Sequence, residues 1–275
     1  MTTLDPLAVS LVCPRNDAES ATILTIGKRL GMDIRQSQQQ SWFCPLENEP
    51  ASTLSRLRHS ICIVEMPGVE KEEMLRQSGH RVFIIDHHDY HSFGLSRWSA
   101  QSSLEQFAAL SGYVLSTDEQ ILAWNDQEYI YGLAARAVPP EKQRWVRAFD
   151  LREQGYSEQE LSRAKQELLS GTQLSNGIYR YTLAHNRFSA LIDEHVFAHR
   201  GRLTNIWCVG MSADKGRAFF FTGQADVVRR LALLGGFSKL SNGQYGIWGG
   251  YELGSEAVDL RLASSLLSEP GIEKS

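Results

Sequence analysis

Three short apolar segments near the start of the chain each end in acidic or imidazole residues, and this pattern constrains the fold more than any other feature. The segments are 8–13 (AVSLVC), 61–66 (ICIVEM) and 82–85 (VFII). Compact β-branched runs of this kind are typical of strands buried on both faces. Because helical stretches lie between them, the first half predicts an α/β fold with a mostly parallel sheet and flanking helices.

The helical stretches carry their own start and stop signals. Residues 18–30 are amphipathic, with Asp17 placed to cap the first turn and Gly31 following the last. Residues 69–78 predict a second helix, and the region after the third apolar segment is largely helical up to residue 149.

The rest of the chain predicts a smaller domain. A capping box, Ser157 with Glu160, opens a helix that ends before the turn-rich segment SGTQLSNG. We therefore expect an α/β domain over 1–155, a linker helix over 156–173 and a small α+β domain over 174–275 that could close over a substrate as a lid. Its expected strands are IYRYTLA, NIWCVGM and AFFFTG, and its expected helices are 225–234 and 256–267.

Composition excludes several classes of protein. The chain has 275 residues, 28 Lys plus Arg against 32 Asp plus Glu, and a net charge of -4, so binding to long nucleic acid is not favoured. Its 4 cysteines are far apart with no CxxC pair, which argues against a disulfide scaffold and a thiolate zinc site. No apolar run suits a secretory signal or a membrane span, so we expect a cytoplasmic protein; a homodimer is compatible with the sequence.

Residues that can bind a metal follow the three apolar segments, and a fourth candidate lies in the helical region. They are Cys13, Asp17 and Glu19, then Glu65, then Asp86, His87 and His88, and finally Asp126. The carboxyl ends of parallel strands form the ligand-binding edge of an open α/β sheet, so these groups should meet there. Neighbouring carboxylates repel one another unless a cation neutralises them. Oxygen and imidazole ligands suit manganese, our first choice, or magnesium, iron or zinc, and there are enough ligands for two metals.

The run IIDHHDYH after an apolar strand resembles the signature of the DHH phosphoesterase superfamily, which includes single-strand exonucleases and cyclic-dinucleotide phosphodiesterases. That family has His-x-x-x-Asp-x-Asp after the first strand, a bridging Asp after the second, then Asp-His-His, then a later Asp. The motif order here is Cys13-x-x-x-Asp17-x-Glu19, Glu65, Asp86-His87-His88 and Asp126. The resemblance covers about the first 150 residues and implies a metal-activated water that attacks phosphorus.

The resemblance also implies a role for each residue. Asp17, Glu19, Glu65, His87 and Asp126 would be metal ligands, with Glu65 bridging. His88 would contact the phosphate or hold the leaving group, and Asp86 would orient His87 or join the metal ligands.

Three positions depart from the family pattern. Cys13 replaces a histidine, and Glu19 and Glu65 replace aspartates. Cys13 is either a thiolate ligand or a buried thiol with the first metal lost. The segment LLGGFSKLSNGQYGIWGG also lacks the GGGH run of many family members.

Two functions follow from these features. The first is a metal-dependent phosphoesterase that hydrolyses a small phosphodiester or phosphoanhydride, such as a cyclic dinucleotide, a short oligonucleotide or a phosphorylated metabolite. The second is a catalytically degenerate relative that binds a phosphorylated ligand or a partner for a regulatory role.

Each candidate residue also has a structural interpretation. Asp17 alone is a helix cap, Glu65 is a loop carboxylate, and Asp126 lies at a helix break. Further residues are interpreted as structural or as solvated surface: His91, His195, His199, Arg200, Arg202, Lys215 and Arg217. The aromatic residues Trp207 and Phe219 to Phe221 are expected in a core rather than in a base-stacking surface.

Overall fold

The computed structural model describes residues 4–39, 43–90, 95–174, 177–202, 204–241 and 243–251. Within it the chain divides into two compact units. Unit 1 comprises Met1–Gln127 and Val138–Tyr156, and unit 2 comprises Glu128–Ala137 and Ser157–Ser275. The predicted helix 256–267 and His91 lie outside the described residues.

Unit 1 is built on a four-stranded sheet in which every neighbouring pair is parallel, in the order β2-β1-β3-β4. Its strands are β1 Val9–Cys13, β2 Asp33–Gln36, β3 Ser60–Val64 and β4 Arg81–Ile85. Its helices are α1 Ala18–Arg29, α2 Val69–Gln77, α3 Ser103–Ser111, the first part of α4 Thr117–Ala135, and α5 Pro140–Glu153, together with the short 3-10 turns Pro6–Ala8 and Leu46–Asn48. The two-residue strands β5 Asp89–Tyr90 and β6 Leu95–Ser96 form a small separate pair. The predicted α/β class with a mostly parallel sheet is confirmed.

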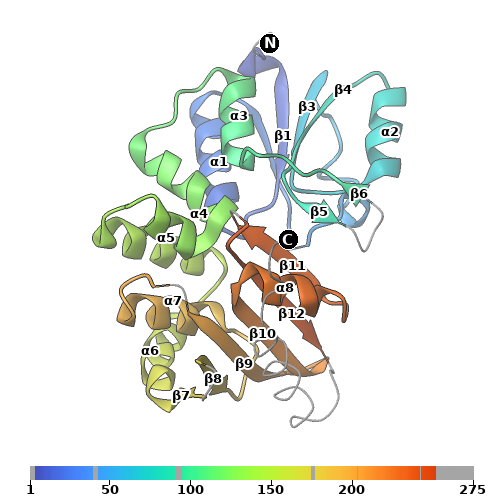
Figure 1. The fold of residues 1–275 in the computed structure, drawn as a ribbon. Coiled ribbons are helices and arrows are strands. Elements are labelled where there is room, and N and C mark those ends of the chain that lie inside the picture. The colour runs from blue at the N-terminus through green and yellow to red at the C-terminus, as the bar shows by residue number, and fades with distance from the viewer. Residues whose placement is uncertain are drawn as a thin grey trace, which may run out of the picture. The chain divides into compact units, whose positions relative to one another are not determined.

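The strand order also fixes where the helices lie. The chain passes from β1 through α1 to β2 at one edge of the sheet, and from β3 through α2 to β4 at the opposite edge. Because such crossovers are right-handed, the two helices cover opposite faces, as Figure 1 shows. All five residues of β1 and of β3 are buried, which explains why both strands consist of apolar and small residues.

Unit 2 contains a six-stranded sheet in the order β11-β12-β10-β9-β8-β7. Its strands are β7 Thr172–Gln173, β8 Ile178–Thr182, β9 Asn205–Ser212, β10 Gly216–Gln224, β11 Phe237–Ser241 and β12 Tyr245–Tyr251. Its helices are the end of α4, α6 Glu158–Glu167, α7 Ser189–Ala198 and α8 Ala225–Ala232, with a 3-10 turn at Leu168–Ser170. The β8 and β9 pair is parallel and the other pairs are antiparallel.

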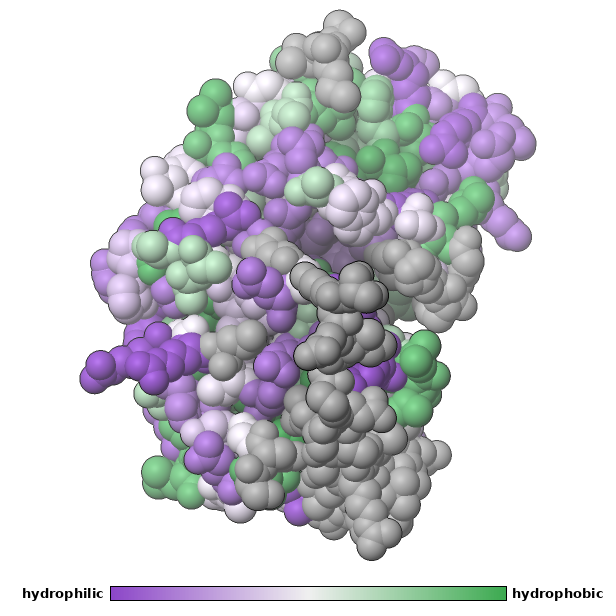
Figure 2. Space-filling view, in the orientation of Figure 1, coloured by the Kyte–Doolittle hydropathy of each residue, from purple (hydrophilic) through white to green (hydrophobic). Residues whose placement is uncertain are grey.

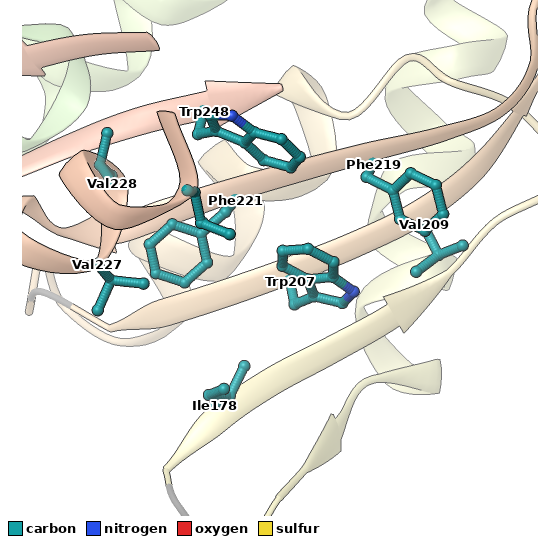
Figure 3. Close-up of a cluster of buried hydrophobic side chains, with 9 residues drawn as sticks. Ile178, Trp207, Val209, Phe219, Phe221, Val227, Val228 and Trp248 are labelled. Atoms are coloured by element: carbon teal, nitrogen blue, oxygen red, sulfur yellow. The ribbon is translucent and has the colours of Figure 1, made fainter. Parts of the chain in front are cut away.

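The core of unit 2 lies between this sheet and α8. Trp207 and Trp248 are fully buried, and their rings stack with centroids 6.1 Å apart. Val227 and Val228 of α8 belong to the same cluster, which Figure 3 shows. The expectation of core residues is confirmed for Trp207, Phe219 and Phe221, which are buried in this cluster. It is wrong for Phe220, which is only half-buried and packs against Phe188 and Phe237, because successive residues of β10 point to opposite faces of the sheet.

The visible surface in Figure 2 mixes hydrophilic residues with scattered hydrophobic ones. Exposed large apolar side chains on the described residues include Trp98 and Leu233. Among the helices described, none combines the length and the apolar character that a membrane crossing requires.

Candidate metal centre

The strand order of unit 1 places the candidate site. The order in which the chain adds strands reverses between the central strands β1 and β3. After β1 the chain adds β2 at one edge of the sheet, and after β3 it adds β4 at the other edge. Ligands of open α/β sheets bind outside the carboxyl ends of the strands at such a switch point. Cys13 ends β1 and Glu65 follows β3, so both lie at this point, and the residues after β4 lie beside them.

Four of the predicted residues come together at this edge. Glu19, Glu65, His87 and Asp126 each offer one ligand atom, and these four atoms all lie within 4.8 Å of one another. The Nε2 atom of His87 lies 2.6 Å from Asp126 Oδ2, 3.4 Å from Glu65 Oε1 and 3.9 Å from Glu19 Oε2. A second group, which shares Glu65 and His87, adds His88.

Glu19 is held by two helices. It lies in the first turn of α1 and is 1% exposed. Its Oε1 atom accepts a hydrogen bond of 2.8 Å from the amide of Leu104, one of the amides that the N-terminus of α3 leaves without a partner inside the helix. The other oxygen, Oε2, is buried with no hydrogen-bond partner among the described residues and faces the group.

Glu65 follows β3 in an unusual backbone conformation. Its φ is 50°, in the left-handed region that non-glycine residues seldom adopt. The backbone amide of Glu65 still donates to Ile85 of β4 at 2.9 Å, which extends the β3–β4 pairing by one residue. Backbone strain of this kind is concentrated at functional sites, and here it accompanies a carboxylate directed at the switch point.

Asp86 holds His88 rather than His87. Its Oδ1 atom accepts from the His88 amide at 3.0 Å and lies 3.1 Å from the His88 ring atom Nδ1. Its Oδ2 atom accepts from the Tyr90 hydroxyl at 3.1 Å. Asp86 is 4% exposed and lies outside both ligand groups, so in this structure its carboxylate orients the second histidine.

The pKa values of the site reflect crowded negative charge. Burial, together with the charges of Asp126 and Glu65, raises the pKa of Glu19 well above its usual value. Burial also acts to raise the pKa of Glu65, but the imidazoles of His88 and His87 outweigh it, so that this pKa is lowered. A divalent cation would relieve the repulsion that raises the pKa of Glu19.

Cys13 and Asp17 take other contacts. The Cys13 thiol is fully buried and lies 3.2 Å from the Pro14 carbonyl and 3.8 Å from the Ser20 carbonyl, the acceptors of its S–H. Burial raises its pKa well above the usual value, and Glu65 adds to that effect. Asp17 caps α1, with Oδ1 accepting from the Ser20 amide at 2.8 Å. Neither residue belongs to the ligand groups formed by the described residues.

The four-residue group fits a hard or borderline divalent cation. It offers carboxylate oxygens and one imidazole nitrogen, a set that suits manganese, magnesium, iron or zinc. The buried Oε2 of Glu19 and Oε1 of Glu65 have no hydrogen bond of normal geometry among the described residues, and a cation would satisfy both.

Two residues of the surroundings were not predicted from the sequence. Tyr90 donates to Asp86, and Arg97 forms an ion pair with Glu72 and lies 4.0 Å from Asp86. Tyr90 follows Asp86 by four residues within the DHH run, a spacing that could have singled it out. Arg97 follows β6 and had no sequence signal, because only the pairing of β6 with β5 brings it back to the site.

No family model and no curated protein matches the sequence. Solved structures do show likeness. A structure of exonuclease RecJ bound to manganese is 11% identical with a TM-score of 0.47, covering 95% of this chain and 90% of that one. RecJ from Thermus thermophilus in complex with Mn²⁺ is 12% identical with a TM-score of 0.44; it covers 95% of this chain, which spans 52% of it.

A third solved structure is the pGpG-specific phosphodiesterase PggH from Vibrio cholerae, which is 11% identical with a TM-score of 0.37, covering 94% of this chain and 98% of that one. RecJ and PggH both belong to the DHH superfamily, which the motif order of this sequence resembles. At identities of 11–12%, the function of this chain has to be inferred from its own residues.

Proposed function

We propose that this chain is a metal-dependent phosphoesterase that hydrolyses a small phosphodiester or phosphoanhydride. The observation that carries the proposal is the convergence of Glu19, Glu65, His87 and Asp126 at the switch point of a parallel sheet. Three of these side chains are at least nine-tenths buried, so the group is built into the fold rather than gathered on an exposed surface.

The four residues would hold the cation, with Glu65 and His87 at the centre of the set because they belong to both ligand groups. A divalent cation at such a site supplies positive charge for phosphoryl oxygens and lowers the pKa of water. The sequence offers enough ligands for two metals, but the two groups share Glu65 and His87, and Cys13 and Asp17 belong to neither, so we expect one cation per chain.

His88 is the side chain that would meet the substrate. Its Nδ1 is held by Asp86, while its side chain keeps 31% exposure, so that the ring can reach a bound molecule. Its Nδ1–H donates to Asp86, so the ring in its doubly protonated form can donate from Nε2 a hydrogen bond to a phosphoryl oxygen or a proton to the leaving oxygen. Tyr90, which also binds Asp86, would help to fix the orientation of the pair.

The second candidate function is binding of a phosphorylated ligand without hydrolysis. It is favoured by one observation: Cys13 and Asp17, the first members of the motif, make contacts with the backbone instead of joining the ligand groups. The two candidates differ in whether bound ligand is turned over.

Metal content and hydrolysis test the proposal together. Protein purified without chelator is analysed by inductively coupled plasma mass spectrometry, and then incubated with Mn²⁺ and a panel of linear and cyclic dinucleotides, pyrophosphate and bis(p-nitrophenyl) phosphate. We expect about one metal per chain and metal-dependent hydrolysis of at least one phosphodiester or phosphoanhydride. His87→Ala should lose both.

His59→Ala is the matched control, because His59 is an exposed histidine of unit 1 at the amino end of β3, the end remote from the site. It should keep metal and activity. Metal binding without turnover of any substrate would favour the second candidate, and an absence of metal in the wild type would refute the proposed function.

A further inference from the structure

A buried arginine of unit 1 contacts the surroundings of two metal-ligand candidates. Arg147 lies on α5 and is 1% exposed. Its NH1 atom donates to Asn125 Oδ1 at 3.2 Å and to Asp150 Oδ2 at 2.7 Å. Asn125 is also buried, at 4% exposure, and it immediately precedes Asp126 on α4.

The partner of Arg147 reaches the other ligand-bearing helix. Asp150 Oδ1 accepts a hydrogen bond of 3.1 Å from the amide of Ala18, the first residue of α1, and Glu19 is the next residue. The Asp150 carboxylate therefore joins Arg147 to α1, while the Arg147–Asn125 bond joins it to α4. One guanidinium thus connects two segments, each one residue away from a candidate metal ligand.

Burying this ion pair has a cost that simple packing would avoid. A buried arginine and carboxylate lose their hydration, and apolar residues of similar volume often serve stability equally well. A metal site, by contrast, needs its ligands held within about 0.5 Å of the productive geometry, and hydrogen bonds around the ligands provide that precision. Because Asp150 pairs with Arg147, the guanidinium acts through geometry rather than as a net charge beside the carboxylates.

We propose that Arg147 is a positioning residue that sets the spacing between Glu19 and Asp126 and thereby the metal affinity. This inference rests on the proposed function, since it requires that the four-residue group binds a cation. It assigns to Arg147 no contact with substrate or metal.

Isothermal titration of the full chain with Mn²⁺ tests the inference. Arg147→Met keeps much of the length of the side chain but removes both hydrogen bonds, and we expect the Kd for Mn²⁺ to rise about 10–100-fold. Arg147→Lys retains the charge, but its side chain is one bond shorter, so its ammonium cannot take the place of NH1 between Asn125 and Asp150 without a shift. Its Kd should therefore lie between those of the wild type and the Met variant.

Arg58→Met is the control for lost stability. Arg58 donates to the carbonyls of Pro6, Val9 and Gly31, at the amino end of β1. Its replacement should lower the Tm while leaving the Kd for Mn²⁺ unchanged. If Arg147→Met does not fold, Asn125→Ala is decisive, because it removes only the bond to α4 and should raise the Kd about tenfold.

The outcomes separate the two claims. If the wild type binds Mn²⁺ and the folded Arg147 variants, or Asn125→Ala in their place, bind it equally well, the positioning role is refuted while the proposed function stands. If the wild type binds no divalent cation, the proposed function fails and the inference fails with it. An equal rise of Kd in Arg58→Met would show a general effect of stability and would also refute the positioning role.

Discussion

Cys13, at the end of β1, can act either as a thiolate ligand of a metal or as a buried thiol, and its surroundings favour the thiol. Its buried thiol contacts backbone carbonyls, and burial raises its pKa well above the usual value, so the thiolate that a metal requires is disfavoured. We predict that Cys13→Ala leaves the metal content per chain unchanged, as measured by mass spectrometry. In native protein, Cys13 should also resist alkylation by iodoacetamide, as read from tryptic peptides.

The opposite result, a lower metal content in Cys13→Ala, would contradict this prediction. Loss of metal in Cys13→Ala would identify the thiol as a ligand. The matched variant is Cys62→Ala, which removes another buried thiol of unit 1 whose pKa is raised to about 12 by burial.

His195 gives a residue-scale prediction for unit 2. The ring is fully buried between the Tyr181 hydroxyl, 2.7 Å from Nδ1, and Thr204 Oγ1, 3.0 Å from Nε2. Burial lowers the pKa of His195 to about 4, and the positive charge of protonated His199, whose ring stacks on that of His195, lowers it further. Tyr179 also packs edge-on against both imidazoles.

The sign of the pH dependence follows from this shift. Between pH 6.5 and pH 4 the unfolded chain, with a histidine pKa of about 6.5, binds a proton that His195 in the folded state does not bind. The free energy of unfolding is therefore unaffected by His195 above pH 6.5 and decreases as the pH drops towards 4. The loss amounts to at most about 3 kcal/mol at pH 4. Urea unfolding at pH 7 and pH 5 should show reduced stability of unit 2 at the lower pH. His195→Gln should flatten the difference, and an unchanged difference in that variant would exclude His195 as its source.

At the scale of elements, the sequence predicted the helices and strands whose apolar residues follow a regular pattern. The strands β1 and β3 were found because buried parallel strands are continuous apolar runs. β4 was found from its apolar run as well, although it lies at the edge of the sheet and is mostly half-buried rather than buried on both faces. α1 was found from its cap and amphipathic pattern. The strand β2 was missed, since its sequence DIRQ is polar and its residues are only half-buried or exposed at the edge of the sheet. In unit 2, β11 and β12 were missed because the glycines that cluster at 235–250 interrupt the alternating apolar pattern of a strand.

The candidate site was likewise predicted in part from the sequence. The sequence predicted Glu19, Glu65, His87 and Asp126 as ligands from their places after strands and in the helical region, and the structure brings these four together. It could not predict which acidic residues take part in capping or in orienting a neighbour. The Asp86–His88 pair and the Arg147–Asp150 pair depend on side-chain directions that no periodicity encodes.

Gly27 gives a prediction at the element scale. It lies in α1 against the sheet, and a Cβ added there would approach Leu11 Cδ2 to 2.5 Å and Ile34 Cδ1 to 3.2 Å. Alanine favours a helix over glycine by about 1 kcal/mol, but overpacking a buried contact costs about 1–3 kcal/mol. We therefore expect Gly27→Ala to lower the Tm, as measured by circular dichroism. Lys28→Ala on the exposed side of the same helix should change the Tm little, and a higher Tm for Gly27→Ala would show that Leu11 moves freely.

At the scale of the whole molecule, the two units should respond differently to a metal. All four members of the ligand group belong to unit 1, on segments that follow β1, β3 and β4 and on the first part of α4. A ligand that binds only the native state stabilises it by about 2.7 kcal/mol at a hundred times its Kd. Metal binding should therefore raise the free energy needed to open unit 1, because opening this unit separates the ligands.

Hydrogen exchange followed by mass spectrometry measures this effect peptide by peptide. With Mn²⁺ at a hundred times its Kd, peptides that contain β1, β3 and β4 should exchange about 100-fold more slowly if they exchange through opening of unit 1. Peptides from β9, β10 and β12 of unit 2 should keep their rates, because those strands carry no member of the group. His87→Ala should abolish the difference in unit 1. Equal protection of both units would contradict the prediction, since it would mean that the two units open as one when the metal leaves.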